Sequence, residues 1–571
     1  MLTQRPTPAF LSQEAARRLP RYALLLLLLA FILSGLWSRD FWTLRDAEAF
    51  GIAKSMLTSG GAAWLLPEVA GAPVTSAGPL ASWVAALFIS LFSSLGEITA
   101  YRLTSLFWFS LTTLTLWRAA LRFARRSEAQ PVAFAFGGEA HSKSFSRTIA
   151  DCTVLFVVGL FGIMARQHEP TTDTALLSFA SLGLFGLSLT LARPVLGAFV
   201  TGLAAGAAMI GSSIAAGIWM LFAGLIVNLL ARTYPGHRDI RCLSLILGAV
   251  LPPVLWIGST LCLYSETGTA WLQAWAAVQL ASFSVPSSEV LLWLSRTASW
   301  YLLPMWPLAL WGFFSWRKNL DRTQILVPTV ITATCLGAGL FTSIQGAEAI
   351  LLISIPALAL AASFGLATLR QTRENLLDWF AISISSLTLI ALWLYWFATL
   401  FGVPPKMAHS IAVLAPTFEP HFGLGLLCSI LAAFCWVSFV TWRVTHRPVV
   451  IWRGPWLSAA GMTACVVTLL GLWHEAFDIN RSYAPIAHEI TVQAERITGQ
   501  KMPLIEGDGL SNGIRATIAH YGEIRFTRPG EVATIRLVRV RDDEAPTRAL
   551  TSAISRPRTD ETFYLVPGRA Q

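Results

Sequence analysis

Long apolar runs recur along this chain and limit the folds open to it more than any other feature. The first extends from Tyr22 to Trp37. Later runs of about 18 or more apolar residues are each long enough to cross the ~30 Å hydrocarbon core of a bilayer. Of the 571 residues, 54% are hydrophobic and 13% are charged, whereas a soluble domain has about 25% charged residues. The sequence therefore predicts an all-α polytopic membrane protein.

Basic loops orient the predicted spans. The first run follows Arg17, Arg18 and Arg21, and no small-residue cleavage site follows it, so we expect a retained span with a cytoplasmic N-terminus. Loop 118–147 is the most basic, and the positive-inside rule places it in the cytoplasm. A span over residues 80–95 would move that loop to the outside. Since this segment is short and contains several serines, we interpret it as a helix in the outer interface. The net charge of +10 is explained by these loops, so no nucleic-acid partner is implied.

With that choice, about thirteen spans remain, and they place the C-terminal region on the outside. They cover residues 20–38, 100–117, 148–166, 174–191, 194–210, 213–231, 242–264, 288–316, 325–342, 347–369, 378–401, 421–442 and 456–474.

The last hundred or so residues differ in character from the rest. The predicted membrane-embedded domain, 1–474, is followed by a region of mixed charge, 475–571, without a spanning run. Helical periodicity covers 484–497, and 523–526, 533–540 and 562–566 have strand patterning. We therefore expect a small α/β domain outside the membrane, in the periplasm.

Acidic residues gather in two predicted external loops, 39–99 and 166–174. The first loop contains Asp46 and Glu48, and the second contains His168, Glu169 and Asp173. Carboxylates at the mouth of a membrane domain are costly unless they pair, bind a cation or take part in chemistry. The topology brings both groups to one membrane face, without establishing that they meet.

The first external loop carries a series of residues that matches a known pattern. Residues 44–60, 66–67, 71–73 and 78–83 resemble the first external loop of the protein-O-mannosyltransferase and aminoarabinose-transferase-like superfamily, of the GT-C class. Segments 172–179, 300–304 and 355–360 are similar to later motifs of that superfamily. The matching loop positions are Asp46, Phe50, Ala53, Met56, Leu57, Ser59, Gly60, Pro67, Gly71, Pro73, Pro79, Leu80 and Trp83.

The resemblance implies a glycosyltransferase of the bacterial inner (plasma) membrane. Such an enzyme moves a hexose or pentose from a polyprenyl-phosphate carrier to a glycan, lipid or protein acceptor on the outer face. Its partners are the lipid-linked sugar donor, membrane lipids and the acceptor.

The acidic residues are the catalytic candidates. Asp46 fits the base that takes the acceptor proton, although an N-cap role for the following helix is also open. Glu48 could assist it or face solvent. Asp173 could orient the acceptor, share a divalent metal ion with Asp46, or cap the next span. His168 and Glu169 are further candidates, with an ordinary surface loop as the alternative.

Three arginines are candidates for the donor phosphate. Arg296 lies inside an apolar run near its outer end, where a cation is costly unless it functions there or reaches the interface. Arg45 and Arg166 flank the two acidic groups and could hold the phosphate or pair with the carboxylates.

Departures from the superfamily pattern keep other functions open. Ala47 replaces a second acidic residue, Ala49 an arginine and Ala77 a lysine, which argues against an aminoarabinose or lipid A role. Two alternatives remain: a transporter or flippase of a lipid-linked substrate, and a catalytically inactive GT-C homologue. A flippase would favour ionisable groups near the membrane midplane and paired broken helices, which the sequence does not suggest.

Overall fold

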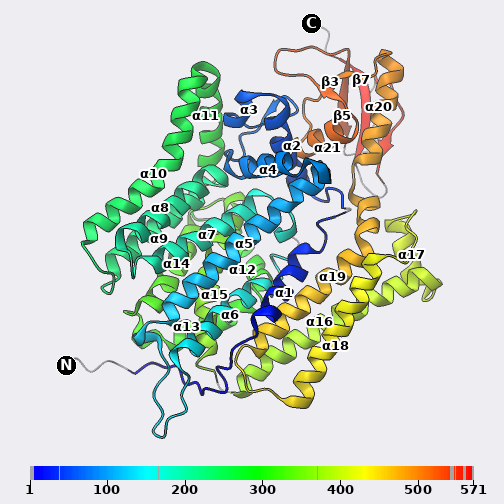
Figure 1. Cartoon of the computed structure of the whole chain (residues 1–571). Coiled ribbons are helices and arrows are strands. Elements are labelled where there is room, and N and C mark those ends of the chain that lie inside the picture. Colours follow the sequence, from blue (N-terminus) through cyan, green and yellow to red (C-terminus); the bar gives the residue numbers. More distant parts are fainter. Residues whose placement is uncertain are drawn as a thin grey trace.

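The computed structural model describes residues 6–37, 39–164, 166–369, 371–540, 546, 548–556 and 561–568. Most of the chain forms a long bundle of apolar helices (Figure 1). The bundle helices are α1 (Arg21–Leu33), α5 (Glu97–Ala124), α6 (Ser142–Val158), α7 (Thr172–Leu189), α8 (Pro194–Gly211), α9 (Ile214–Leu230), α10 (Arg238–Leu263), α11 (Ser265–Leu280), α12 (Ser288–Tyr301), α13 (Met305–Ser315), α14 (Thr323–Leu340), α15 (Ile344–Leu366), α16 (Gln371–Phe401), α18 (Leu424–His446) and α19 (Arg453–Arg481).

The polytopic all-α prediction is confirmed. Within the described part of the chain, eight helices have the length and composition to cross a membrane: α7, α8, α10, α14, α15, α16, α18 and α19. Helices α1, α4 (Leu80–Leu91) and α9 are shorter apolar helices. Every predicted span coincides with a helix, but 288–316 is two helices because residues 302–304 are not helical. Pro304, which cannot donate a backbone hydrogen bond, directly precedes α13.

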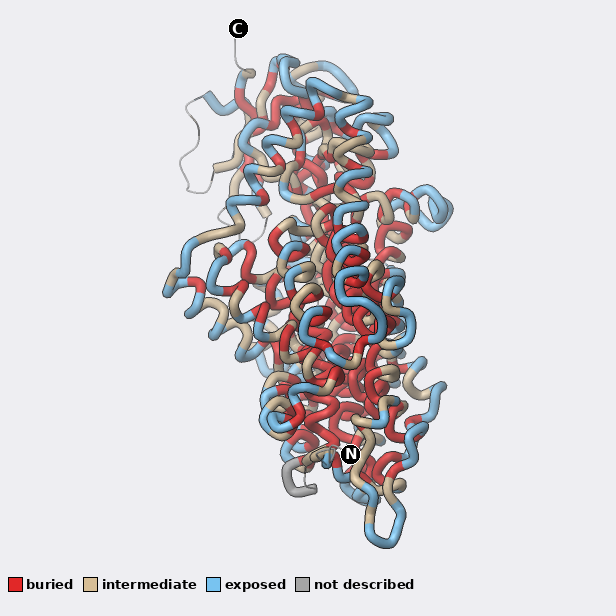
Figure 2. The backbone as a smooth tube through the Cα atoms, turned by 90° about the vertical axis from the view of Figure 1, so that its left-hand side faces the viewer, coloured by how far each residue is buried: buried red, intermediate tan, exposed pale blue. Residues whose placement is uncertain are grey.

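Helix α15 forms the centre of the bundle. It packs against α6, α7, α13 and α14, and its residues are almost all buried, whereas those of α18 are mostly exposed along the outer surface. Figure 2 shows the buried residues concentrated along the middle of the molecule. In a membrane protein the exposed apolar side chains of the outer helices are the surface that lipid covers.

The two ends of the bundle differ. At one end the N-terminal segment pairs with the loop between α5 and α6, through Val132 N–H to Ala9 O (3.0 Å) and Ala140 N–H to Leu11 O (3.0 Å). At the other end, α2 (Leu44–Thr58), α3 (Gly61–Leu65) and α4 lie beside the C-terminal region (Figure 1). A short antiparallel pair, β1 (Glu68–Val69) and β2 (Ala72–Pro73), follows α3.

The C-terminal region contains a five-stranded mixed sheet with strand order β4-β3-β5-β7-β6 and a hydrophobic core of its own. Strand β3 is parallel to β4 and β5, and β7 is antiparallel to β5 and β6. Helix α19 continues to Arg481, past the predicted boundary at 475. A short helix, α17 (Pro405–Leu414), precedes α18, and the elements after α19 are α20 (Ala484–Thr498), β3 (Leu504–Glu506), α21 (Asn512–Tyr521), β4 (Arg525–Phe526), β5 (Ile535–Val540), β6 (Ile554–Ser555) and β7 (Thr562–Pro567).

Helix α21 docks directly on α2. A methyl group added at Gly51 would lie 2.6 Å from the Cβ atom of Ala516, and one added at Gly513 would meet the carbonyl oxygen of Leu44. Contacts this close leave no room for a larger residue, so these two glycines allow the C-terminal region to dock on α2.

Candidate active site

Asp46 lies at the centre of a fully buried polar network at the end of the bundle. It sits in the first turn of α2, where Thr43 caps the helix by accepting a hydrogen bond from the Asp46 N–H at 3.2 Å. The Asp46 carboxylate is 3.2 Å from the Arg102 guanidinium on α5, and both side chains are completely buried. The Tyr101 hydroxyl donates to the same carboxylate at 3.0 Å. An unpaired charge would be very costly at such a site, so the Arg102 guanidinium is needed to neutralise the buried Asp46 carboxylate.

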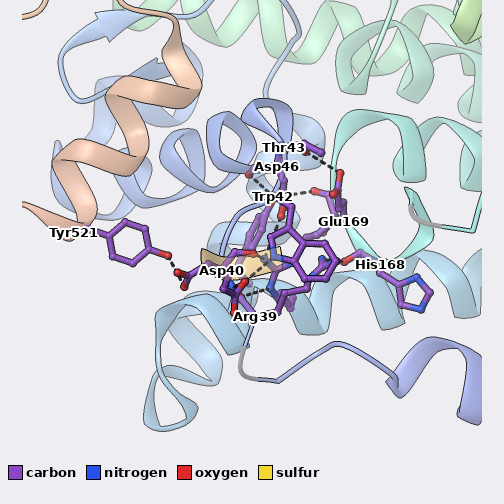
Figure 3. A network of polar contacts seen from close by, with 12 residues as sticks. Arg39, Asp40, Trp42, Thr43, Asp46, His168, Glu169 and Tyr521 are labelled. Atoms are coloured by element: carbon purple, nitrogen blue, oxygen red, sulfur yellow. Dashed lines mark hydrogen bonds and ion pairs between the residues drawn. The ribbon is translucent and has the colours of Figure 1, made fainter. Parts of the chain in front are cut away.

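A second buried arginine extends this network. Arg39 donates to the carbonyl oxygen of His168 at 3.0 Å, and Arg102 donates to the carbonyl oxygen of Asp40 at 2.8 Å. Burial and the nearby Arg102 charge lower the pKa of Arg39 to about 10. The first contact joins the segment after α1 to the turn before α7 (Figure 3). The second joins the same segment to α5.

Glu169 borders this network and also lines a cavity. Its residue is 9% exposed, and the Thr43 hydroxyl donates to its carboxylate at 2.9 Å (Figure 3). Burial, followed by the Asp46 charge, raises the pKa of Glu169 to about 7. A carboxyl with that pKa is partly ionised at neutral pH and suited to proton transfer.

Four charged side chains form a closed group beside Glu169, which we call the rim quartet: Arg45, Arg166, Asp173 and Glu348. Arg166 is 2.7 Å from Asp173 and also pairs with Glu348. Arg45 is 2.9 Å from Glu348 and 3.4 Å from Asp173. Two guanidinium groups and two carboxylates neutralise one another. The Arg45 side chain is nonetheless 66% exposed, which leaves it free to change partner.

A cavity of about 610 Å³ is lined by residues of loops 39–99 and 166–174 and of the C-terminal region. Glu169 and three members of the rim quartet line it, together with residues from the end of α19 and from the C-terminal region. The lining residues are Phe41, Trp42, Thr43, Leu44, Arg45, Ala47, Arg166, Glu169, Thr171, Asp173, Arg481, Tyr483, Thr517, Arg556 and Glu561.

The structure therefore brings part of the predicted site together. Arg45, Arg166, Glu169 and Asp173 line one cavity, and Asp46 lies in the buried network coupled to Glu169.

Three candidates lie elsewhere. Both ring nitrogens of His168 contact backbone carbonyls, of Phe31 at 2.7 Å and Met164 at 2.9 Å. Burial lowers the pKa of His168 to about 4, against the two carbonyl contacts, which favour the protonated ring. Glu48 accepts from Ser76 at 3.0 Å instead. Arg296 is exposed on α12 and is not a cavity-lining residue.

The Asp46 carboxylate pairs with Arg102, and the Asp173 carboxylate pairs with Arg166. Over the residues that the structure describes, no group of three His, Cys, Asp or Glu side chains is placed to hold a metal ion.

The sequence did not point to Tyr101, Arg102 or the residues of the C-terminal region that line the cavity. The position of Arg102 could have indicated its role, because it lies just inside a predicted span, where a cation needs a partner. Glu348 carries a similar signal at the start of the span 347–369. The lining residues Arg481, Tyr483, Arg556 and Glu561 carry none, because only the docking of the C-terminal region brings them to the site.

Comparison with known proteins supports the fold assignment. No protein-family model matches the sequence, and no curated protein does. The chain is similar to the crystal structure of ArnT from Cupriavidus metallidurans bound to undecaprenyl phosphate. It matches with a TM-score of 0.62 at 17% identity, over 95% of this chain and 96% of that one. The apo form of ArnT matches with a TM-score of 0.61 at the same identity. The protein has a GT-C class fold.

Proposed function

We propose that this protein is a membrane glycosyltransferase that moves a sugar from a polyprenyl-phosphate carrier to an acceptor hydroxyl in the cavity. The observation that carries this proposal is the cavity itself, in which carboxylates and guanidinium groups face one space at the end of the bundle. Transfer needs both: a base for the acceptor proton and cations for the departing phosphate. The undecaprenyl phosphate in the ArnT crystal supports a carrier of this kind.

Glu169 is the proposed base. It lines the cavity, and its raised pKa suits proton transfer near neutral pH. The sequence favoured Asp46 for this role, but the Asp46 side chain is completely buried and held by Arg102 and Tyr101. We therefore assign Asp46 to positioning: its charge raises the pKa of Glu169, and its ion pair fixes the start of α2.

The rim quartet is the proposed donor-phosphate site. As the sugar–phosphate bond breaks, the acceptor oxygen bonds to the sugar carbon, its proton passes to Glu169, and the phosphate leaves with the bonding electrons. Arg45, which is largely exposed, and Arg166 would then exchange a carboxylate partner for phosphate. Asp173 would orient the acceptor. A donor that arrives already activated explains how such an enzyme works without a nucleotide-binding motif.

The proposed location is the bacterial inner membrane, with the cavity on its outer face. Support comes from charge: the basic loop 118–147 and the N-terminal segment share the end of the bundle opposite the cavity. The N-terminus would then be cytoplasmic, and the predicted domain 475–571 periplasmic. The acceptor would be a glycan, lipid or protein of the cell envelope.

Release of free polyprenyl phosphate tests the proposal. Purified protein in lipid nanodiscs would receive a panel of polyprenyl-phosphate hexoses and pentoses with envelope extract as acceptor. We expect release from at least one donor, and a fall of about 100-fold or more in Glu169→Gln. Glu48→Gln, which alters a nearby carboxylate outside the cavity, should keep the wild-type rate.

The same assay separates Glu169 from Asp46. If Asp46 acts through Glu169, Asp46→Asn should move the acidic limb of the pH–rate profile to lower pH, because the charge that raises the pKa is removed. Loss of release at every pH in Asp46→Asn protein that is still folded by tryptophan fluorescence, with activity kept in Glu169→Gln, would make Asp46 the base. Release from no donor would favour the flippase or the inactive homologue.

A further inference from the structure

A second groove lies away from the proposed active site and shares none of its lining residues. It has a volume of about 440 Å³ and is lined by residues of α1, α5 and α6. On α5 the lining residues recur at every third or fourth position from Leu106 to Trp117, so they form one stripe along the helix. The stripe on α1 has the same spacing and consists of Arg21, Leu24, Leu25, Leu28, Leu29 and Ile32.

Most of this groove is apolar and open at the surface of the bundle. Leu25, Leu29 and Leu114 line it, and they are 58%, 45% and 55% exposed. At a rise of about 1.5 Å per residue, the α1 stripe from Arg21 to Ile32 is about 16 Å long. This is about half of the ~30 Å hydrocarbon core of a bilayer. The groove therefore has the length of one lipid leaflet.

The charged side chains of the groove gather at one end. Arg21 is the first residue of α1, and Arg147 and Asp151 belong to the first half of α6. Arg147 is 3.7 Å from Asp151, and the Trp117 indole N–H donates to the same carboxylate at 2.8 Å. The Arg147 guanidinium also donates to the carbonyl oxygen of Leu19 at 3.3 Å, which joins α6 to the segment that leads into α1.

Arg21 is the cation of this cluster that is available to a ligand. Two guanidinium groups and one carboxylate line the groove, and the carboxylate pairs with Arg147. Arg21 is exposed, and within the described part of the chain its side chain forms no hydrogen bond or ion pair, although its charge acts on Asp151 through space. Arg17 and Arg18, which precede it, are exposed as well. Basic residues at the end of a membrane helix attract anionic lipid headgroups.

We propose that this groove binds one anionic phospholipid, with its phosphate on Arg21 and one acyl chain along the leucines of α1. Such a lipid matches both parts of the groove, because it carries its negative charge at one end and is apolar over the length of a leaflet. The Trp117 indole lies at the headgroup level, where tryptophan is common in membrane proteins. On the location proposed above, this lipid belongs to the cytoplasmic leaflet and is distinct from the sugar carrier.

Native mass spectrometry of the full-length protein tests the headgroup contact without requiring activity. Protein would be released from phosphatidylcholine nanodiscs that contain a rising fraction of phosphatidylglycerol, and the retained phosphatidylglycerol would be counted. We expect one molecule to be retained at low fractions, and Arg21→Gln should raise the fraction needed for half occupancy about tenfold. Arg238→Gln is the matched control: Arg238 is also an exposed arginine at the first position of a bundle helix, but it does not line this groove. An equal shift in both variants, or in neither, would overturn the proposal.

A bulky side chain in the apolar part tests the acyl-chain contact. Ser110 is exposed on α5 and lines the groove, so Ser110→Phe should fill it and abolish retention. Ser438→Phe, at an exposed serine of α18 outside the groove, should have no effect. Three outcomes would overturn the proposal. Retention could survive Ser110→Phe, inorganic phosphate alone could remove the difference between wild type and Arg21→Gln, or the wild type could form a dimer that Ser110→Phe dissociates, which would assign the groove to a second copy of the chain.

Discussion

Replacing Asp46 with Asn should destabilise the fold strongly, because it leaves the buried guanidinium of Arg102 without its carboxylate. The two groups are 3.2 Å apart and both side chains are fully buried. Removing one partner of such a pair costs about 3–5 kcal/mol. We expect the upper part of that range, because the Asp46 charge also offsets the repulsion between Arg39 and Arg102. Asn can still accept the Tyr101 hydrogen bond, so the loss measures charge more than hydrogen bonding.

The free energy of unfolding in mixed detergent micelles, followed by tryptophan fluorescence, measures this effect. Glu97→Gln is the matched control: it breaks a 2.7 Å pair with Lys54 in which both side chains are partly exposed, and such pairs contribute about 1 kcal/mol or less. The double variant Asp46→Asn with Arg102→Gln should recover part of the loss, because it removes the stranded charge. If Asp46→Asn costs no more than Glu97→Gln, the argument for a buried ion pair is wrong.

Three further predictions follow from the same geometry. The pKa of Glu169 is raised from 4.5 to about 7, so the folded state binds the carboxyl proton more tightly than the unfolded state. The stability that the protonated carboxyl contributes is therefore lost as the pH rises to 7. Glu169→Gln should therefore be more stable than wild type at pH 8, by up to about 3 kcal/mol in the free energy of unfolding. If the difference in stability between variant and wild type is the same at pH 5 and pH 8, the pKa of Glu169 is not raised. Gly513→Ala should loosen the C-terminal region, because the added methyl group meets the Leu44 carbonyl, and limited proteolysis should cut that region faster than in wild type; unchanged cleavage would mean that the contact is not tight. Arg296→Gln should leave the release rate within about twofold of wild type, because Arg296 is exposed on α12 outside the cavity, and a loss of tenfold or more would restore it as a donor-phosphate ligand.

Hydropathy and charge predicted the bundle because each span is a local property of the sequence. The predicted helix 484–497 and the three predicted strands likewise coincide with α20, β4, β5 and β7. The short elements β3 and β6 and helix α21 were not predicted. Strands β3 and β6, of three and two residues, form here by pairing with the longer strands β5 and β7.

The site was predictable only in part. Charge asymmetry placed both acidic loops on one face, and the structure joins them through Thr43 with Glu169 and Arg45 with Asp173. Sequence could not say that Asp46 would be buried behind Glu169, because that depends on Arg102, more than fifty positions away on α5. It also could not place Arg481 and Arg556 in the same cavity as these loops, because the contact of α21 with α2 joins distant parts of the sequence.

Photo-crosslinking with a polyprenyl-phosphate sugar that carries a photoreactive group on the sugar tests the central claim most directly. We expect cross-links in nanodiscs to segments that line the cavity, 41–47 and 166–173, and their loss when unlabelled donor is added. Competed cross-links confined to α12 around Arg296, or to the end of the bundle that carries the N-terminal segment, would contradict the account.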